Sequence, residues 1–505
     1  MARASLQISL LFAVDKALGL VRVAIIGRQF GVSPALDAFN AANNIPDLLF
    51  ALISGGALSL AFIPVLAAVL GNEGRPALWL LFSRVANLAF LITAGLAVVV
   101  AVVADPLVRS EVGVAPGFTS EVQTLVVQLM RLNLVATLLF SMSGLVVAGL
   151  QANKSFFLPA LAPVAYDVGQ IFGALVLAPA QPVTLGPITL PAAGLGVHGL
   201  VYGVILGAGL HLAVQIPGLL RYRFQWTPVL RWRDAGVLRV ARLLGPRILT
   251  IGAFQLIFII QDNLASRLAV GSVTALTYGW LILQLPETLI ATAVATALLP
   301  SIAELFAGGA AAAFESLVAR AVRVLTVLTV PVTALMLLFV EPFVQAVFRF
   351  DPQGTALVVG AARAYLLGLL GHSLLEVAAR AFYAQEDART PLRVTVVGLT
   401  AFAVCAALLF RPLGANGIAL ANSIAFTLEA VILLLLLRRT YPSVARLRGP
   451  AARTLLGTAA ACGASLLAWS LIPSAGVAAA GACLMIGAGV ALPFMLPELR
   501  QLAAL

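Results

Sequence analysis

The sequence predicts an all-α membrane protein that crosses the bilayer many times. Three observations support this prediction: 61% of the 505 residues are hydrophobic, only 10% are charged, and the mean hydropathy is +1.06. Soluble globular domains are far more polar. Apolar runs of bilayer-spanning length recur along the whole chain, and the loops between them leave no room for a separate soluble catalytic domain.

At ~20 residues per crossing, the apolar runs predict about fourteen transmembrane helices. They are expected over residues 5–29, 34–69, 77–104, 123–150, 157–180, 193–220, 241–268, 272–305, 317–346, 358–384, 390–410, 414–437, 453–472 and 475–496. The first run continues into Asp15 and Lys16 without a small-residue cleavage site, so we interpret it as a retained span and not as a signal peptide.

The basic residues predict the orientation of the chain in a bacterial cytoplasmic membrane. Loops after even-numbered helices hold most of them, including clusters at 221–242 and 438–453. By the positive-inside rule, these loops and both termini are expected in the cytoplasm. The same scattering over short loops accounts for the net charge of +11, so no nucleic-acid partner is expected.

An internal repeat predicts how the helices are grouped. IPDLL at 45–49 corresponds to LPETL at 285–289, an offset of about 240 residues, and a second proline follows in each copy. Six helices separate equivalent points, and an even number preserves orientation, so the repeats are expected to be parallel. We therefore expect two six-helix lobes, helices 1–6 in residues 1–222 and helices 7–12 in residues 223–440, followed by two additional C-terminal helices in residues 441–505.

The first predicted helix carries three charged residues at membrane depth. Asp15 and Arg22 are two turns apart on one face, and Lys16 lies about 100° round the helix. Ionisable groups inside a membrane are costly and commonly mark a transport pathway. We interpret Lys16 and Arg22 as substrate-binding cations for an anionic group, with Asp15 neutralising or orienting one of them; a closed intrahelical ion pair is the structural alternative.

Proline interrupts the second and eighth predicted helices. A carboxylate follows each proline, where it could either cap a half-helix or serve as a cation or proton site in a cavity, and both interpretations stay open. The predicted gating or hinge residues are Pro46, Asp47, Gly55, Gly56, Pro286 and Glu287.

Asp262, in the seventh predicted helix, is a candidate for a coupling-ion site, with an interfacial position as the alternative. No spacing of Cys or His suggests a bound metal. The chain also contains no nucleophile with a base, no Walker loop and no dinucleotide fingerprint in a plausible context. We therefore expect no enzyme activity and no cofactor, and transport would draw on a Na⁺ or H⁺ gradient, the membrane potential or the substrate gradient.

Several segments resemble one family. They are LGLVRVAIIGRQFG (18–31), LDAFNAANNIPDLLFALISGGALSLAFIPVL (36–66), QANKSFFLPALAP (151–163), GPRILTIGAFQ (245–255), TALLPSIAELF (296–306) and GHSLLEVAARAFYAQEDARTPLRV (371–394). In this order they are similar to the MurJ (MviN) family, the lipid II flippases of the multidrug/oligosaccharidyl-lipid/polysaccharide exporter superfamily. The resemblance implies two lobes around a central cavity, alternating access, and a groove for a polyprenyl tail on the last two helices.

The resemblance also implies basic cavity residues on helices one, two and eight. Lys16 and Arg22 match the helix-one positions. The chain departs from the pattern at Phe50 and Ala51 in helix two and at Trp280 and Leu281 in helix eight. Some relatives bind sodium beside helix seven; Asp262 matches that site, whereas helix eleven offers no carboxylate.

The expected function is a flippase for a polyprenyl-diphosphate-linked saccharide, with the peptidoglycan precursor lipid II as the leading candidate. Its partners would be that lipid, the membrane lipids and candidate cell-wall synthesis proteins. One alternative is a divergent flippase or exporter for another saccharide lipid or an amphipathic substrate. Another is a non-transporting membrane scaffold that recruits proteins through the basic loops.

Overall fold

Helices make up nearly all of the protein. The computed structural model describes residues 2–53, 57–444, 448–472 and 476–502. Their contacts divide the chain into two compact units, Met1–Arg267 and Leu268–Leu505, and each is described by itself. The predicted all-α membrane fold is confirmed. The lobe boundaries at 222 and 440 concern the internal repeat and stay a prediction.

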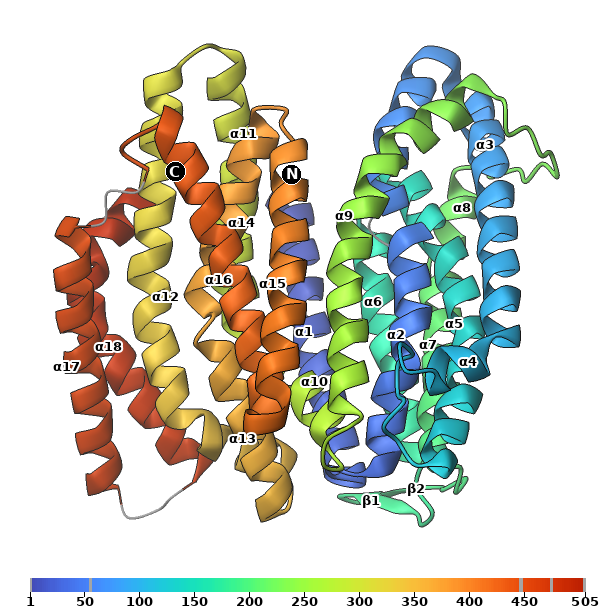
Figure 1. Cartoon of the computed structure of the whole chain (residues 1–505). Coiled ribbons are helices and arrows are strands. Elements are labelled where there is room, and N and C mark those ends of the chain that lie inside the picture. Colours follow the sequence, from blue (N-terminus) through green and yellow to red (C-terminus); the bar gives the residue numbers. More distant parts are fainter. Residues whose placement is uncertain (1, 54–56, 445–447, 473–475, 503–505) are drawn as a thin grey trace. The chain divides into compact units, whose positions relative to one another are not determined.

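The first unit is a helical bundle with one small hairpin (Figure 1). Its elements are α1 (Ala2–Phe30), α2 (Pro34–Ile53), α3 (Ala57–Val102), α4 (Ala104–Arg109), α5 (Ser120–Ala152), α6 (Phe157–Phe172), the π-helical turn η1 (Gly173–Leu177), β1 (Val183–Leu185), β2 (Ile188–Leu190), α7 (Val197–Ala213), α8 (Ile216–Arg221) and α9 (Ala235–Ala265).

The second unit is a second helical bundle, and its last two helices pack against α12. Its elements are α10 (Ser272–Pro286), the π-helical turn η2 (Glu287–Thr292), α11 (Ala293–Ala307), α12 (Ala311–Phe348), α13 (Pro352–Leu366), α14 (Leu369–Ala384), α15 (Arg389–Leu413), α16 (Ala415–Thr440), α17 (Arg448–Leu471) and α18 (Val477–Leu502).

The described residues contain ten helices that are long and apolar enough to cross a membrane, or eleven if α13 and α14, bent by 43°, form one span. The more polar α1 and α2 are not among the ten, and α9 contributes only the shorter apolar stretch Ile251–Ala265. A multi-pass membrane protein is therefore confirmed, whereas the number fourteen stays a prediction.

Local chemistry explains most of the breaks between helices. Gly74 separates the two halves of α3 with φ 82°, a left-handed conformation that glycine adopts without strain. Gly186, with φ 60°, begins the turn between β1 and β2, which pair in antiparallel register with Val183 opposite Leu190. This hairpin lies in a segment for which the sequence predicts a loop.

The two proline-containing segments of the internal repeat behave differently. α2 continues through Pro46 without a break, so Asp47 does not start a new half-helix there. At Pro286, α10 ends and the π-helical turn η2 begins with Glu287. A π-helical turn locally widens the helix and is frequent at functional sites. The expected hinge roles of these residues stay predictions.

Close packing of α6 on α7 positions the polar part of the first unit. A Cβ atom at Gly173 would lie 2.5 Å from the Gly203 Cα atom, and one at Gly207 would lie 2.6 Å from the Tyr166 carbonyl oxygen. Real side chains do not tolerate such contacts, so glycine is required for the two backbones to approach this closely. The neighbouring residue of Tyr166 on α6 is Asp167.

Candidate functional site

An ion pair joins α1 to α6 within the first unit. Arg22 Nη1 lies 3.1 Å from Asp167 Oδ1, and the two side chains are 22% and 6% exposed. The Arg22 guanidinium carbon also lies 5.9 Å from the centre of the Tyr166 ring. Gly19, one turn before Arg22 on α1, lies beside this contact: a Cβ atom there would lie 3.7 Å from Asp167 Oδ2, at ordinary van der Waals distance.

The second basic residue of α1 pairs locally. Lys16 Nζ lies 3.6 Å from Asp15 Oδ2, and the Lys16 side chain is 75% exposed. Asp167 interacts electrostatically with Asp15 and Lys16 as well as with Arg22. The predicted trio therefore meets in one cluster. Asp15 pairs with Lys16, which is one of the two arrangements expected within the helix, whereas the pairing of Arg22 with Asp167 was not expected.

Aromatic side chains surround this cluster. The Phe50 ring lies 5.3 Å from the Phe140 ring, and Phe140 lies 5.0 Å from Tyr166, which faces Arg22. Phe50 is one of the positions at which the resemblance implies an arginine. Where the resemblance implies a cation on helix two, this chain has an aromatic ring. That ring contacts Phe140, Phe140 contacts Tyr166, and the Tyr166 ring faces Arg22.

Asp47 is exposed on α2, and it is near enough to Tyr166 to interact with it electrostatically. Counted as ionised groups, the cluster holds two cations, Lys16 and Arg22, and three carboxylates, Asp15, Asp47 and Asp167. In this conformation the positive charge of the two cations is compensated. At the largely buried Arg22, an anionic group would therefore compete with the Asp167 carboxylate, whereas the exposed Lys16 ammonium has further donors available.

Asp262 lies in a separate polar cluster of the first unit, between α9 and α2. Its side chain is 4% exposed, accepts a hydrogen bond from Asn44 Nδ2 and is also bonded to Gln261. A second bond of this cluster joins Asn133 Nδ2 to Asn43 Oδ1 at 2.6 Å. Among the described residues, no Lys, Arg or His nitrogen lies within 4.0 Å of the Asp262 carboxylate, so its partners are neutral amides.

A histidine connects the polar groups of the second unit. His372 Nδ1 lies 3.7 Å from Glu287 Oε1, and His372 Nε2 lies 3.1 Å from Asn422 Oδ1. The ring stacks on Phe426 at 4.1 Å, and Trp280 lies 5.5 Å away edge-on. Glu287, predicted as a hinge residue, thus contacts a buried histidine directly.

The remaining predicted residues are accounted for as follows. Pro46 is buried, and Thr137 donates a hydrogen bond to its carbonyl oxygen at 3.5 Å. Leu281 is half-buried on α10. Gly55 and Gly56 lie outside the described residues. Within the described ranges, no group of three His, Cys, Asp or Glu side chains could hold a metal ion.

Sequence reasoning missed Asp167 and His372 as members of these clusters. Asp167 is a lone acidic residue in an apolar run, which is itself a signal for function in a membrane helix. His372 is a single histidine flanked by Gly and apolar residues, a setting that favours a packing or loop role over catalysis. Glu376 and Arg380, which have the i, i+4 spacing of a helical ion pair, form one on α14.

Comparison with known proteins identifies the family. The family model described as "Lipid II flippase MurJ" matches residues 26–485. The chain belongs to the MurJ family. A curated MurJ-family relative, "Lipid II flippase MurJ" of Burkholderia cenocepacia, is 31% identical over 447 residues, which cover 86% of this chain and 84% of the relative. Membership of this flippase family confirms the prediction of a transport protein and not an enzyme.

Solved structures share the fold. "Lipid II flippase MurJ, inward closed conformation" aligns with a TM-score of 0.77 at 19% identity and covers 98% of this chain and 99% of that chain. An inward-facing MATE family multidrug transporter of the MOP superfamily aligns with a TM-score of 0.70 at 17% identity, over 85% of this chain and 95% of that one. At these identities the likeness shows that the MurJ-family chain shares their fold.

Proposed function

We propose that this chain is a flippase that moves lipid II, a polyprenyl-diphosphate-linked saccharide, across the bacterial cytoplasmic membrane by alternating access, with both termini in the cytoplasm. Family membership supports the transport class. The observation that carries the substrate class is the pair of cations on α1, Lys16 and Arg22, which match the positions implied for diphosphate binding.

The proposed binding step is an exchange of anions at Arg22. Without substrate, Asp167 Oδ1 compensates the Arg22 guanidinium at 3.1 Å. A diphosphate offers several oxygens to the same donors, and a guanidinium binds such a group with two parallel hydrogen bonds. Lys16, which is largely exposed, would supply the second positive charge. The rings of Tyr166 and Phe140 would restrict water around the pair and strengthen the attraction.

Asp262 is the proposed site of coupling. A buried carboxylate whose partners are amides is stabilised by a proton or a small monovalent cation, because leaving the charge uncompensated in a membrane protein is costly. Binding of that ion would alter the contact between α9 and α2, which Asp262 and Asn44 form. Flipping that responds to a sodium gradient supports sodium as the ion, and flipping that responds only to a pH gradient supports the proton.

The experiment that tests the function has two arms. Cells depleted of their own lipid II flippase are complemented with this chain, and the purified protein is reconstituted into vesicles that contain lipid II or a polyprenyl diphosphate with a different saccharide. We expect rescue of growth and flipping of lipid II. Flipping of the other lipid alone, without rescue, would identify a different saccharide lipid as substrate. An intact protein that flips neither would contradict the proposal and favour a scaffold.

A further inference from the structure

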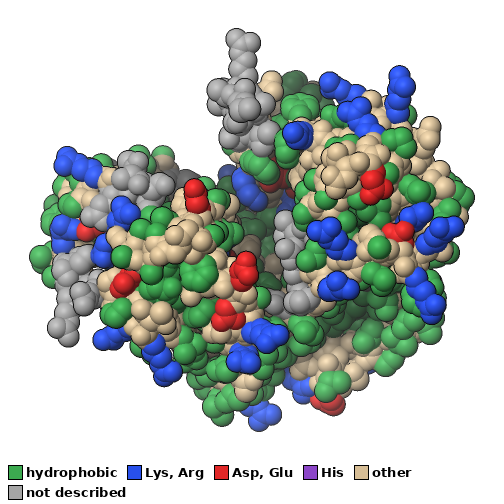
Figure 2. Space-filling view, turned by 90° about the horizontal axis from the view of Figure 1, so that it is seen from above, with side chains coloured by type: hydrophobic (Ala, Val, Ile, Leu, Met, Phe, Trp, Pro, Cys, Tyr) green, Lys and Arg blue, Asp and Glu red, His purple; other side chains and the backbone are tan. Residues whose placement is uncertain are grey.

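A basic pocket lies at one end of the first unit, away from the α1–α6 cluster. It has a volume of about 260 Å³ and lies between the start of the second half of α3 and the segment that follows α8. Arg75, Arg221 and Arg223 line it, and its lining contains no Asp or Glu. On the face of the molecule seen in Figure 2, Lys and Arg side chains are more prominent than Asp and Glu.

Arg223 has a backbone conformation that normally selects glycine. Its φ is 52°, and the chain ends α8 with two hydrogen bonds, Arg223 N to Leu220 O and Phe224 N to Leu219 O, each 3.0 Å long. This is the pattern of a helix C-terminus at which glycine is the usual residue. A residue with a side chain costs roughly 1–2 kcal/mol there. Arg223 adopts this strained backbone conformation, and its side chain lines the pocket.

Hydrogen bonds and ring contacts join the two segments that line the pocket. Trp79 Nε1 donates to the Tyr222 carbonyl oxygen at 3.0 Å, and the Trp79 and Phe224 rings lie 5.1 Å apart. Next to these contacts, Asn87 Nδ2 donates to the Thr227 carbonyl oxygen at 2.8 Å. These bonds attach the segment after α8 to α3, and the backbone that carries the arginines is therefore anchored to a helix.

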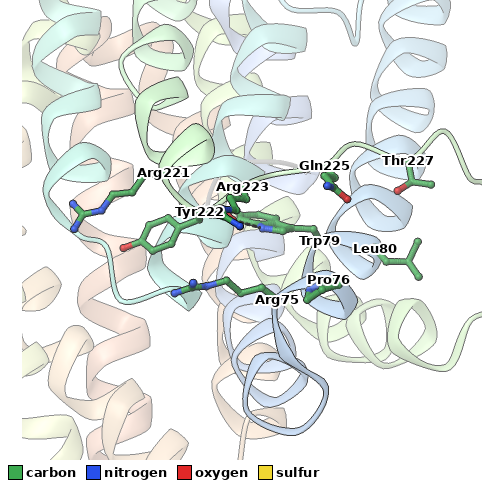
Figure 3. A pocket seen from close by; sticks show the side chains of 9 residues that line it. All are labelled: Arg75, Pro76, Trp79, Leu80, Arg221, Tyr222, Arg223, Gln225 and Thr227. Carbon is green, nitrogen blue, oxygen red and sulfur yellow. Dashed lines mark hydrogen bonds between the residues drawn. The ribbon is translucent and has the colours of Figure 1, made fainter.

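In the part of the chain that the structure describes, the three arginines have no acidic partner. Among the described residues, no carboxylate oxygen lies within 4.0 Å of Arg75, Arg221 or Arg223. In contrast, Arg84, nine residues further along α3, pairs with Asp234 at 2.5 Å. The Arg75 guanidinium carbon lies 5.3 Å from the centre of the Tyr222 ring. Figure 3 shows Arg75 extended below that ring, with Arg221 near its hydroxyl end in the same view.

The segment around the pocket has the composition of a membrane interface. Trp226 and Trp232 are both 60% exposed, although Trp is among the most hydrophobic side chains. Exposed Trp residues interleaved with Arg are typical of the lipid headgroup region. In the headgroup region, the most abundant molecules that carry a phosphate group are the phospholipids.

We propose that this pocket binds the phosphate group of an anionic ligand through Arg75, Arg221 and Arg223, with an anionic phospholipid headgroup as its source. Guanidinium groups bind phosphate with paired, charge-assisted hydrogen bonds. A free phosphate would satisfy the same donors, but only a lipid would also contact Trp226. The site is distinct from Lys16 and Arg22, and its role is to bind a lipid that is not transported.

The test is native mass spectrometry of the purified full-length protein in detergent. The probes are phosphatidylglycerol, phosphatidylcholine as the zwitterionic comparison, and inorganic phosphate. The variants are R75Q and R223G, with R438Q/R439Q as a matched control that removes exposed arginines at the end of α16. R223G distinguishes a loss of binding from a loss of folding. Glycine adopts the left-handed conformation without strain, so this variant should fold normally although it lacks the guanidinium.

We expect phosphatidylglycerol to bind in preference to phosphatidylcholine, and R223G and R75Q each to weaken binding about tenfold. R223G should melt at the same temperature as the parent protein or higher, and R438Q/R439Q should bind as the parent does. Binding of inorganic phosphate with the same dependence on Arg75 and Arg223, without lipid preference, would support the phosphate site with a soluble source. Lipid and phosphate binding that neither variant changes would overturn the proposal.

Discussion

Arg22 on α1 and Asp167 on α6 form an ion pair of 3.1 Å that closes the polar cluster of the first unit. In the proposed binding step, a substrate diphosphate competes with this carboxylate for the same guanidinium. The pair is therefore both a structural contact between two helices and the proposed control on substrate binding.

Replacing Asp167 with Asn should make Arg22 available to the substrate. We expect D167N to bind lipid II several-fold more tightly, because the competing negative charge is removed, and to flip it more slowly, because the carboxylate no longer displaces the diphosphate on release. Binding and flipping are measured on the same reconstituted protein. D105N, a change of the same kind at an exposed ion pair of α4, is the control. An unchanged affinity in folded D167N would exclude competition.

The glycine packing of α6 on α7 predicts a stability effect that reaches the site. In G207A, the added Cβ would lie 2.6 Å from the Tyr166 carbonyl oxygen, next to Asp167. We expect a loss of about 1–3 kcal/mol in stability and weaker substrate binding, because overpacking must be relieved by backbone shifts. Thermal unfolding in detergent measures the first effect. G209A on the same helix is the control, because its Cβ would meet no atom within 4 Å. Equal melting of the two variants would contradict the packing account.

The aromatic cluster of the second unit predicts the effect of removing Trp280. Its ring lies 5.6 Å from Tyr365 and 5.5 Å from His372. We expect W280A to lose about 3 kcal/mol of stability, in the range for a packed aromatic residue, and W280F to lose clearly less because a ring remains. Denaturation of the two variants in the same detergent gives the comparison. If W280F were as unstable as W280A, the ring contacts would not be the cause.

Asp387, in the loop before α15, predicts a dependence of stability on pH. Its carboxylate accepts hydrogen bonds from the Thr390 hydroxyl at 2.6 Å and from the Arg389 and Thr390 backbone N–H groups at 3.0 Å. The Thr390 side-chain hydrogen bond is the largest cause that holds the pKa of this carboxyl below its usual value. Because the folded pKa is lowered, the stabilisation is present above the unfolded pKa of about 3.9 and is lost as the pH falls through the folded pKa.

We therefore expect D387A to melt below the parent protein at neutral pH, by an amount equivalent to about 1 kcal/mol, as for other residues that cap a helix. The difference should shrink once the pH falls below that folded pKa. Melting curves from neutral to acidic pH test this. A difference that stays constant down to the most acidic pH would show that the carboxylate charge is not involved.

Much of this fold follows from composition and periodicity alone. The helical membrane class, the break near Arg75 and the Glu376–Arg380 pair could all be predicted, because each depends on residues close together in the sequence. The hairpin at 183–190 could not, since its strands have only three residues each and carry little periodic signal.

The partners of the charged residues were harder to predict. Asp15 and Arg22 share a face of α1, yet Arg22 pairs with a residue on α6, because tertiary packing brings Asp167 closer. Asn44 and Asp262 are joined in the same way across 218 positions of sequence. Such contacts depend on which helices pack against each other. The helical period shows which residues share a face of one helix, but not which other helix that face contacts.

The most direct test of the account is the flipping rate of the K16Q/R22Q double variant in vesicles that contain lipid II. Both substitutions remove a positive charge and leave a shorter, uncharged polar side chain. We predict a loss of at least about tenfold, because each interaction of the diphosphate with a cation is worth roughly 1.5–3 kcal/mol, and unchanged flipping in R438Q/R439Q. Flipping at the parental rate by folded, fully reconstituted K16Q/R22Q would contradict the assignment of Lys16 and Arg22 as the substrate-binding cations.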